Sequence, residues 1–90
     1  MKRFKVFFHR KAEKSLYRLP KSVLALVYEL VSVLEENPVP WSSWDLKPLK
    51  GRNNIYRVRL GDYRLIYALY LERNEIVIMN IAVRGKAYSD

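Results

Sequence analysis

The hydrophobic pattern of the first third of the chain changes its period once. Apolar side chains alternate imperfectly through residues 2–9, which predicts a first strand. Residues 10–19 carry a narrow apolar stripe between basic positions, which predicts a short basic helix ended by Pro20. Residues 21–36 carry a wide apolar face at helical spacing, which predicts a second helix that stops at Asn37-Pro38. Because the connection between them is short, the two helices should form an antiparallel hairpin.

The second half of the chain returns to strand periodicity after a long connection. Residues 37–53 have no hydrophobic period and contain three prolines, so we predict a loop. Residues 54–60 and 63–71 flank Gly61-Asp62, a pair typical of β-hairpin turns. Residues 75–83 are apolar at nearly every position, which predicts a central strand. The expected fold class is α+β with the order βααβββ, a two-helix hairpin packed on one face of a mostly antiparallel four-stranded sheet.

Strand alternation places three arginines on one face of the predicted hairpin. With Gly61 and Asp62 as the turn, Arg59 lies opposite Arg64, and Arg57 shares their side of the sheet. The other side is apolar and must pack on the helices: Tyr56, Val58, Leu60, Tyr63, Leu65, Tyr67 and Leu69. Like charges directly opposite each other destabilise a strand pair by up to about 1 kcal/mol. The cluster is therefore either neutralised or solvated, with Asp62 the obvious carboxylate in sequence, or it binds phosphate through the guanidinium fork.

Further basic side chains would enlarge this surface into a nucleic-acid-binding patch: Lys11, Lys14, Lys47, Lys50, Arg52, Arg84 and Lys86. Alternation does not settle the side of Arg84. Strict counting through a tight second turn puts Val83, not Arg84, on the face of the three arginines. A β-bulge, or a bend at Gly85, would bring Arg84 round to it.

The charge distribution points to a polyanion or an acidic protein as partner. The net charge is +8, and residues 22–46 contain no lysine or arginine, so both ends of the chain are basic and the middle is acidic. The absence of cysteine excludes disulfides and thiolate chemistry, and a single histidine argues against a dedicated metal site. No apolar run is long enough to span a membrane. We expect one cytoplasmic domain over residues 1–90 that needs no cofactor.

Several segments resemble the RelE/ParE toxin superfamily, and within it the archaeal RelE branch. They are FFHRKAEKSLYRLP (7–20), LKPLKG (46–51), YRVRLGDYRLIYAL (56–69) and IAVRGKAY (81–88). The resemblance implies the toxin of a type II toxin–antitoxin system, which enters the ribosomal A site and cleaves the mRNA there. The ribose 2′-hydroxyl attacks the adjacent phosphate, and no metal takes part. The implied partner is a RelB-like antitoxin, so the chain would be a monomer alone and part of a hetero-oligomer with the antitoxin.

The resemblance also implies a role for individual residues. Arg64 would bind the scissile phosphate, Arg84 would stabilise charge or assist the leaving group, and Tyr88 would stack on or orient the nucleotide. Arg57 and Arg59 stand where better-studied toxins carry lysines. Because arginine effectively never deprotonates, neither can readily act as a general base.

The general base and two rival functions stay open on the sequence alone. The candidate bases are His9, Lys47, Lys50 and Tyr88, with His9 expected to be a strand-end residue instead. Catalysis would then be mostly electrostatic and positional, with the ribosome aligning the RNA. One rival is a ParE-like gyrase inhibitor, against which the arginine cluster and Tyr88 argue. The other is a non-catalytic module that only binds RNA or an antitoxin.

Overall fold

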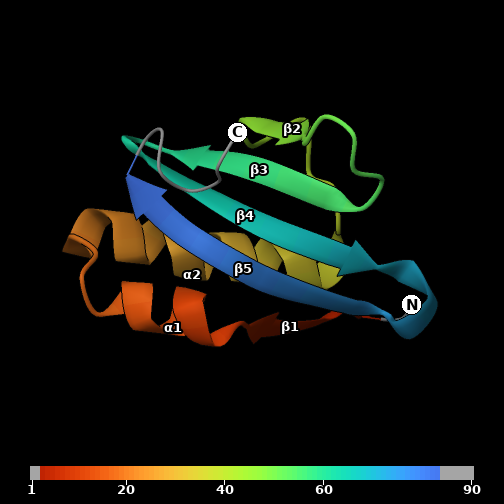
Figure 1. Cartoon of the computed structure of the whole chain (residues 1–90), viewed down its shortest axis with the longest axis horizontal. Helices are drawn as coiled ribbons and strands as arrows, with labels where there is room; N and C mark the ends of the chain where they lie inside the picture. Colours follow the sequence, from red (N-terminus) through yellow and green to blue (C-terminus); the bar gives the residue numbers. More distant parts are fainter. Residues whose placement is uncertain (1–2, 84–90) are drawn as a thin grey trace.

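Two helices lie along one face of a five-stranded sheet in the computed structural model, which describes residues 3–83 (Figure 1). The elements in chain order are β1 (Lys5–Phe8), α1 (Arg10–Leu16), α2 (Lys21–Glu36), β2 (Leu46–Pro48), β3 (Ile55–Leu60), β4 (Tyr63–Tyr70), the 3₁₀-helix η1 (Leu71–Arg73) and β5 (Glu75–Val83). The predicted α+β class and the helical hairpin are confirmed. Within residues 3–83, no helix is both long and apolar enough to cross a membrane.

The sheet has one strand more than the pattern predicts. Its order is β1-β5-β4-β3-β2, with β1 parallel to β5 and the other neighbours antiparallel. The prediction of four strands was wrong, because β2 lies inside the segment predicted as a loop. Three residues that include a proline show no detectable alternation, and proline is tolerated on an edge strand such as this one. β5, between β1 and β4, is the interior strand that its apolar sequence predicts.

The helices begin and end at residues with clear local reasons. The backbone N–H of Lys11 donates to Nδ1 of His9, which caps the N-terminus of α1 at 3.1 Å. α1 is shorter than the apolar stripe predicts and ends at Leu16, because Pro20 follows within a turn. Pro20 then stands at the N-cap of α2, and the chain leaves the helix at Asn37. His9 thus stands at the end of β1, as expected, and caps α1.

The core lies between the helices and the predicted apolar side of the β3–β4 hairpin. Its fully buried members include Val27, Leu30 and Leu34 of α2 and Val58, Leu60, Leu65, Tyr67, Ile76 and Ile78 of the sheet. Tyr67 stacks on Tyr56 with ring centroids 5.4 Å apart, and its hydroxyl donates to the carbonyl oxygen of Pro38 at 2.6 Å. Burial, and secondarily Tyr56, raises the pKa of the Tyr67 hydroxyl above its usual value, so it stays a donor. This bond ties the segment before β2 to the sheet.

Candidate active site

The β3–β4 hairpin has the register that alternation predicts. Arg59 is the direct partner of Arg64, and Arg57 is the partner of Ile66. Gly61 has φ of +64°, which glycine adopts without strain and which the tight turn requires. The three arginines therefore share the side of the sheet that faces away from the helices, and we call this surface the arginine face.

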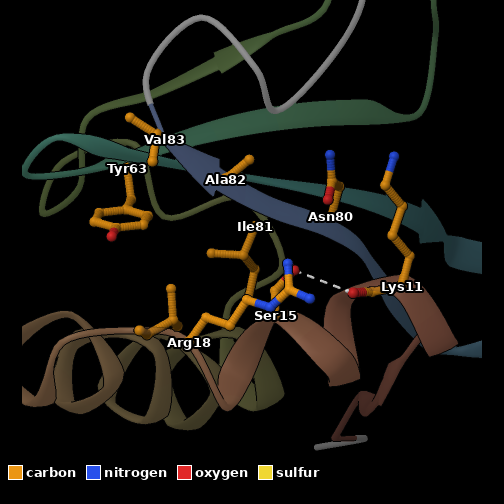
Figure 2. A pocket seen from close by; sticks show the side chains of 9 residues that line it. Lys11, Ser15, Arg18, Tyr63, Asn80, Ile81, Ala82 and Val83 are labelled. Atoms are coloured by element: carbon orange, nitrogen blue, oxygen red, sulfur yellow. Dashed lines mark hydrogen bonds between the residues drawn. The ribbon is translucent and has the colours of Figure 1, made fainter.

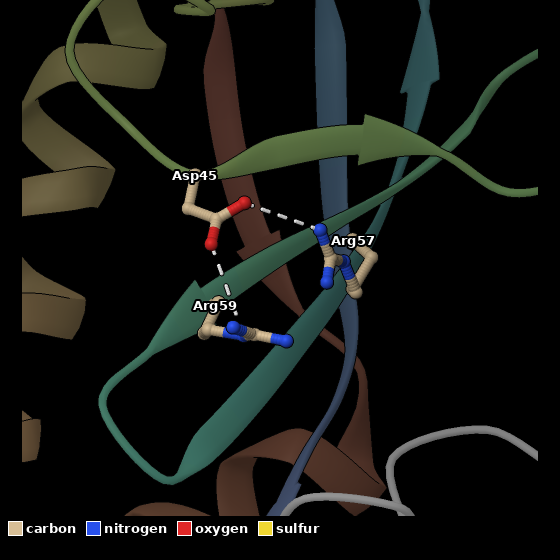
Figure 3. A network of polar contacts seen from close by, with 3 residues as sticks. All are labelled: Asp45, Arg57 and Arg59. Carbon is tan, nitrogen blue, oxygen red and sulfur yellow. Dashed lines mark hydrogen bonds and ion pairs between the residues drawn. The ribbon is translucent and has the colours of Figure 1, made fainter.

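Asp45 neutralises part of the arginine face, in place of the expected Asp62 (Figure 3). One carboxylate oxygen of Asp45 lies 3.3 Å from Nη2 of Arg57, and the other lies 3.8 Å from Nε of Arg59. Asp62 is exposed at the turn and forms no ion pair with any residue from 3 to 83. Only the pairing of β2 with β3 brings Asp45 to this face. The sequence alone carries no pattern that indicates this contact.

Arg64 and Arg57 carry buried donor atoms without partners. Within the described part of the chain, Nη1 of Arg64 and Nε of Arg57 are buried and have no hydrogen-bond acceptor. Arg57 is only 6% exposed, and a second apolar cluster that contains Ile66, its cross-strand partner, and Ala68 lies on the same side of the sheet. The attraction between a guanidinium group and an anion is stronger beside apolar side chains than in bulk water, because the local dielectric constant is lower. A buried donor without a partner needs an explanation, and an anion bound to Arg64 would supply one.

A β-bulge in β5 reverses the expected alternation at its end. Ile66 pairs with Asn80 but Tyr67 pairs with Ile78, so Met79 is the extra residue. Ala82 is consequently the partner of Arg64 on the arginine face, and Val83 is the partner of Tyr63 on the helix side. The strict counting that put Val83 on the arginine face was wrong. Arg84, Lys86 and Tyr88 lie outside the described residues.

The remaining basic candidates are placed around the arginine face at different positions. Lys47 in β2 is the direct partner of Arg57, so it shares the face and is exposed there. Lys50 and Arg52 are exposed in the turn that connects β2 to β3. Among the candidate bases that the structure describes, Lys47 is thus the amine that lies on the arginine face itself.

A groove of about 300 Å³ separates α1 from the last part of β5 (Figure 2). Lys11 and Arg18 line it on the helix side, and Asn80 and Ala82 line it on the strand side. β1 has ended at this point, so α1 is the next element beside the strand. Because Asn80 and Ala82 belong to the arginine face, the groove brings Lys11 to the edge of that face. Lys14, also in α1, does not line it.

Known proteins share both the sequence and this arrangement. The model of the ParE toxin of the type II toxin–antitoxin system parDE matches residues 6–88. The matched segment contains both helices and the β3–β4 hairpin, which places the chain in a class of protein toxins. The chain belongs to the RelE/ParE superfamily of type II toxins.

The relatives with substantial identity bear the RelE name. The chain is 38% identical to a protein assigned as toxin RelE1 in Methanocaldococcus jannaschii, over 98% of both chains. It is similar to a chain of the archaeal RelE–RelB complex from Pyrococcus horikoshii, with 36% identity, a TM-score of 0.82 and coverage of 93% and 98%. It is also similar to a chain of the RelBE2 complex from Mycobacterium tuberculosis, with 30% identity, a TM-score of 0.73 and coverage of 91% and 99%. The resemblance to archaeal RelE toxins is thereby confirmed.

Proposed function

We propose that the protein is a toxin that cleaves mRNA on the ribosome, as a metal-independent endoribonuclease of the cytoplasm. The observation that carries the proposal is the pair of Arg59 and Arg64, directly opposite each other, with Nη1 of Arg64 buried and unpartnered among the described residues. Holding two guanidinium groups together destabilises the free sheet. A bound phosphodiester offsets this repulsion and satisfies the buried donor.

The chemistry that fits this face is attack of a ribose 2′-hydroxyl on the adjacent phosphate. Oxygen bonds to phosphorus, the 5′-oxygen leaves with a proton, and the 2′-hydroxyl proton passes to a base, which leaves a cyclic phosphate. Arg64 would bind the scissile phosphate, and Arg59 and Arg57 would stabilise the negative charge of the crowded phosphorane. In this proposal Arg84 assists the leaving oxygen, Tyr88 orients the nucleotide, and Lys47, Lys50, Arg52, Lys11, Lys14 and Lys86 contact RNA or ribosome.

Cleavage should depend on the ribosome, because the arginines of this face cannot remove the 2′-hydroxyl proton and the protein has no clear general base. Acid–base catalysis typically contributes about 10²–10⁴-fold. We expect a programmed ribosome to be cut at least about 10²-fold faster than the same RNA free in solution. The measurement is end mapping of both RNAs after incubation with purified protein, together with a test for 2′,3′-cyclic phosphate ends.

The same preparation discriminates the rival functions. Rapid, specific cleavage of free RNA would contradict ribosome dependence. Protection of RNA without any new ends would indicate a non-catalytic binding module. Inhibition of gyrase supercoiling, with intact mRNA on ribosomes, would indicate a gyrase inhibitor.

We further propose that the partner of this toxin is an acidic, RelB-like antitoxin, since the similar RelE chains were solved in complexes with RelB. An acidic chain is attracted by the net charge of +8 and by the arginine face. We expect its association rate to fall as salt increases and to fall further in Arg59→Ala. Stopped-flow binding across a salt series measures this, with Arg73→Ala in η1, beyond the far end of β4, as the control. A salt-independent rate would contradict charge steering.

A further inference from the structure

Asp45 is a carboxylate placed among the arginines of a surface that should bind an anion (Figure 3). We propose that Asp45 is a positioning residue for RNA cleavage, which fixes the guanidinium groups of Arg57 and Arg59 and leaves Arg64 to take the phosphate. The inference rests on the proposed function, since it names a further residue of the same site. It assigns Asp45 no proton transfer and no contact with RNA.

The position of Asp45 follows from the pairing of β2 with β3. The backbone N–H of Arg59 donates to the carbonyl oxygen of Asp45 at 2.9 Å, which continues the ladder one step beyond Leu46. Lys47 pairs with Arg57, so Asp45, two residues earlier, points to the same side of the sheet. The backbone pairing thus holds the carboxylate beside the arginines.

The two oxygens of this carboxylate contact two different arginines. The oxygen nearer Arg57 accepts a hydrogen bond from Nη2 at 3.3 Å, while the other oxygen faces Nε of Arg59 at 3.8 Å. The side chain of Arg57 is 8% exposed, whereas those of Arg59 and Asp45 are 42% and 49% exposed. Asp45 therefore joins a buried guanidinium to an exposed one, and limits the rotamers that the exposed one adopts.

β2, β3 and β4 place Lys47, Arg57, Arg59 and Arg64 on this face, beside the carboxylate of Asp45. A carboxylate at this place weakens the attraction for a phosphate. If affinity alone mattered, Asp45 would be unfavourable. Its bridging contacts supply geometry instead, and rate depends steeply on geometry, since a misplacement of about 1 Å can cost about 10²-fold. Affinity and rate should therefore respond in opposite directions when Asp45 is changed.

The test is Asp45→Asn, measured under single-turnover conditions on programmed ribosomes. The amide keeps one acceptor oxygen and the backbone bond to Arg59, but its NH2 group replaces one of the two oxygens that face the arginines. We expect the maximal cleavage rate to fall by about 10-fold or more, while the half-saturating concentration stays equal or decreases. Binding to a single-stranded RNA oligonucleotide should become tighter, and its salt slope should steepen by up to about 0.7 for each extra phosphate contact.

Two variants separate positioning from charge and from folding. Asp62→Asn removes the same charge from the exposed turn of the same hairpin, and its cleavage rate should equal that of the wild type. Asp45→Glu keeps the carboxylate on a longer stem and should restore much of the rate. The Nε–Hε NMR signals of Arg57 and Arg59 should report restricted motion in the wild type and greater motion of Arg59 in Asp45→Asn. This readout is independent of cleavage.

Each outcome decides one of the two proposals. An Asp45→Asn protein that cleaves as fast as the wild type, or that loses rate only through weaker binding, overturns the positioning role. A loss that Asp45→Glu does not restore and that accompanies a lower melting temperature overturns it too, in favour of a purely structural role. A wild-type protein that never cuts RNA on ribosomes overturns the proposed function, and the positioning role with it, whatever the NMR signals show.

Discussion

Arg64→Ala should lower the rate of mRNA cleavage on ribosomes by about 10²–10³-fold, which corresponds to a loss of about 3–4 kcal/mol of transition-state stabilisation. The reason is that Arg64 carries the guanidinium whose buried Nη1 has no partner within residues 3–83, whereas Arg57 and Arg59 are engaged by Asp45. Loss of growth inhibition in cells and the single-turnover rate on programmed ribosomes both measure this. Arg84→Ala should also impair cleavage, as the resemblance implies.

The matched control for Arg64 is Arg73→Ala. Arg73 follows β4 in η1, is exposed, and pairs with Glu75 at the far end of the hairpin. Arg73 also lies over the ring of Tyr70, six residues from Arg64 along β4, so the substitution removes the same charge far from Arg59 and Arg64, and cleavage should stay near the wild-type rate. The fold of Arg64→Ala should survive, because the change relieves the repulsion between Arg59 and Arg64. A well-expressed Arg64→Ala protein that remains fully toxic would refute the assignment of the site.

Arg57→Met should separate stability from activity. Arg57 is almost completely buried, its Nε has no partner among the described residues, and its ion pair reaches a carboxylate that is half exposed. Burying a guanidinium with incomplete pairing lowers the free energy of unfolding. After the substitution, Asp45 would still form its ion pair with Arg59. We expect the free energy of unfolding to stay equal or rise by about 1–2 kcal/mol, and cleavage to fall by about 10²-fold. Urea denaturation and single-turnover cleavage measure the two quantities.

Arg59→Met is the control for the opposite effects of Arg57→Met on stability and on cleavage. The Arg59 side chain is 42% exposed, so its charge is already partly hydrated, and its removal should gain at most the relief of its repulsion with Arg64, up to about 1 kcal/mol. Arg57→Met unfolding more readily than wild type by over about 1 kcal/mol would show that Arg57 supports the fold. A stable Arg57→Met protein with wild-type activity would remove Arg57 from the catalytic face.

Part of the candidate site was predictable from local sequence patterns. The turn at Gly61-Asp62 fixes the register of the hairpin, and the register fixes which side chains share a face. Arg57, Arg59 and Arg64 had to lie together for that reason, and their opposite side had to form the core. The bounds of α2 and β5 were equally predictable, since each has a strong period or a continuous apolar sequence.

Asp45 was not predictable, because it is 12 residues from Arg57 and lies in a segment without a hydrophobic period. Only the pairing of β2 with β3 brings the two together, and so short a strand leaves no signature. The bulge at Met79 could not be decided from the sequence either. An extra residue leaves no mark in the composition of a strand and only shifts every later residue to the other face.

The sequence by itself therefore determined the local elements, the core side of the hairpin and the cluster of three arginines. Covalent geometry sets these, through the period of a strand or a helix and the need to bury one face. The tertiary structure decided which carboxylate joins the arginines, that Arg57 and Arg64 keep unpartnered donors within residues 3–83, and that Lys47 and Lys11 lie at the same surface. Those contacts join segments far apart in the chain. They depend on how the elements pack together, and a local sequence pattern carries no information about that packing.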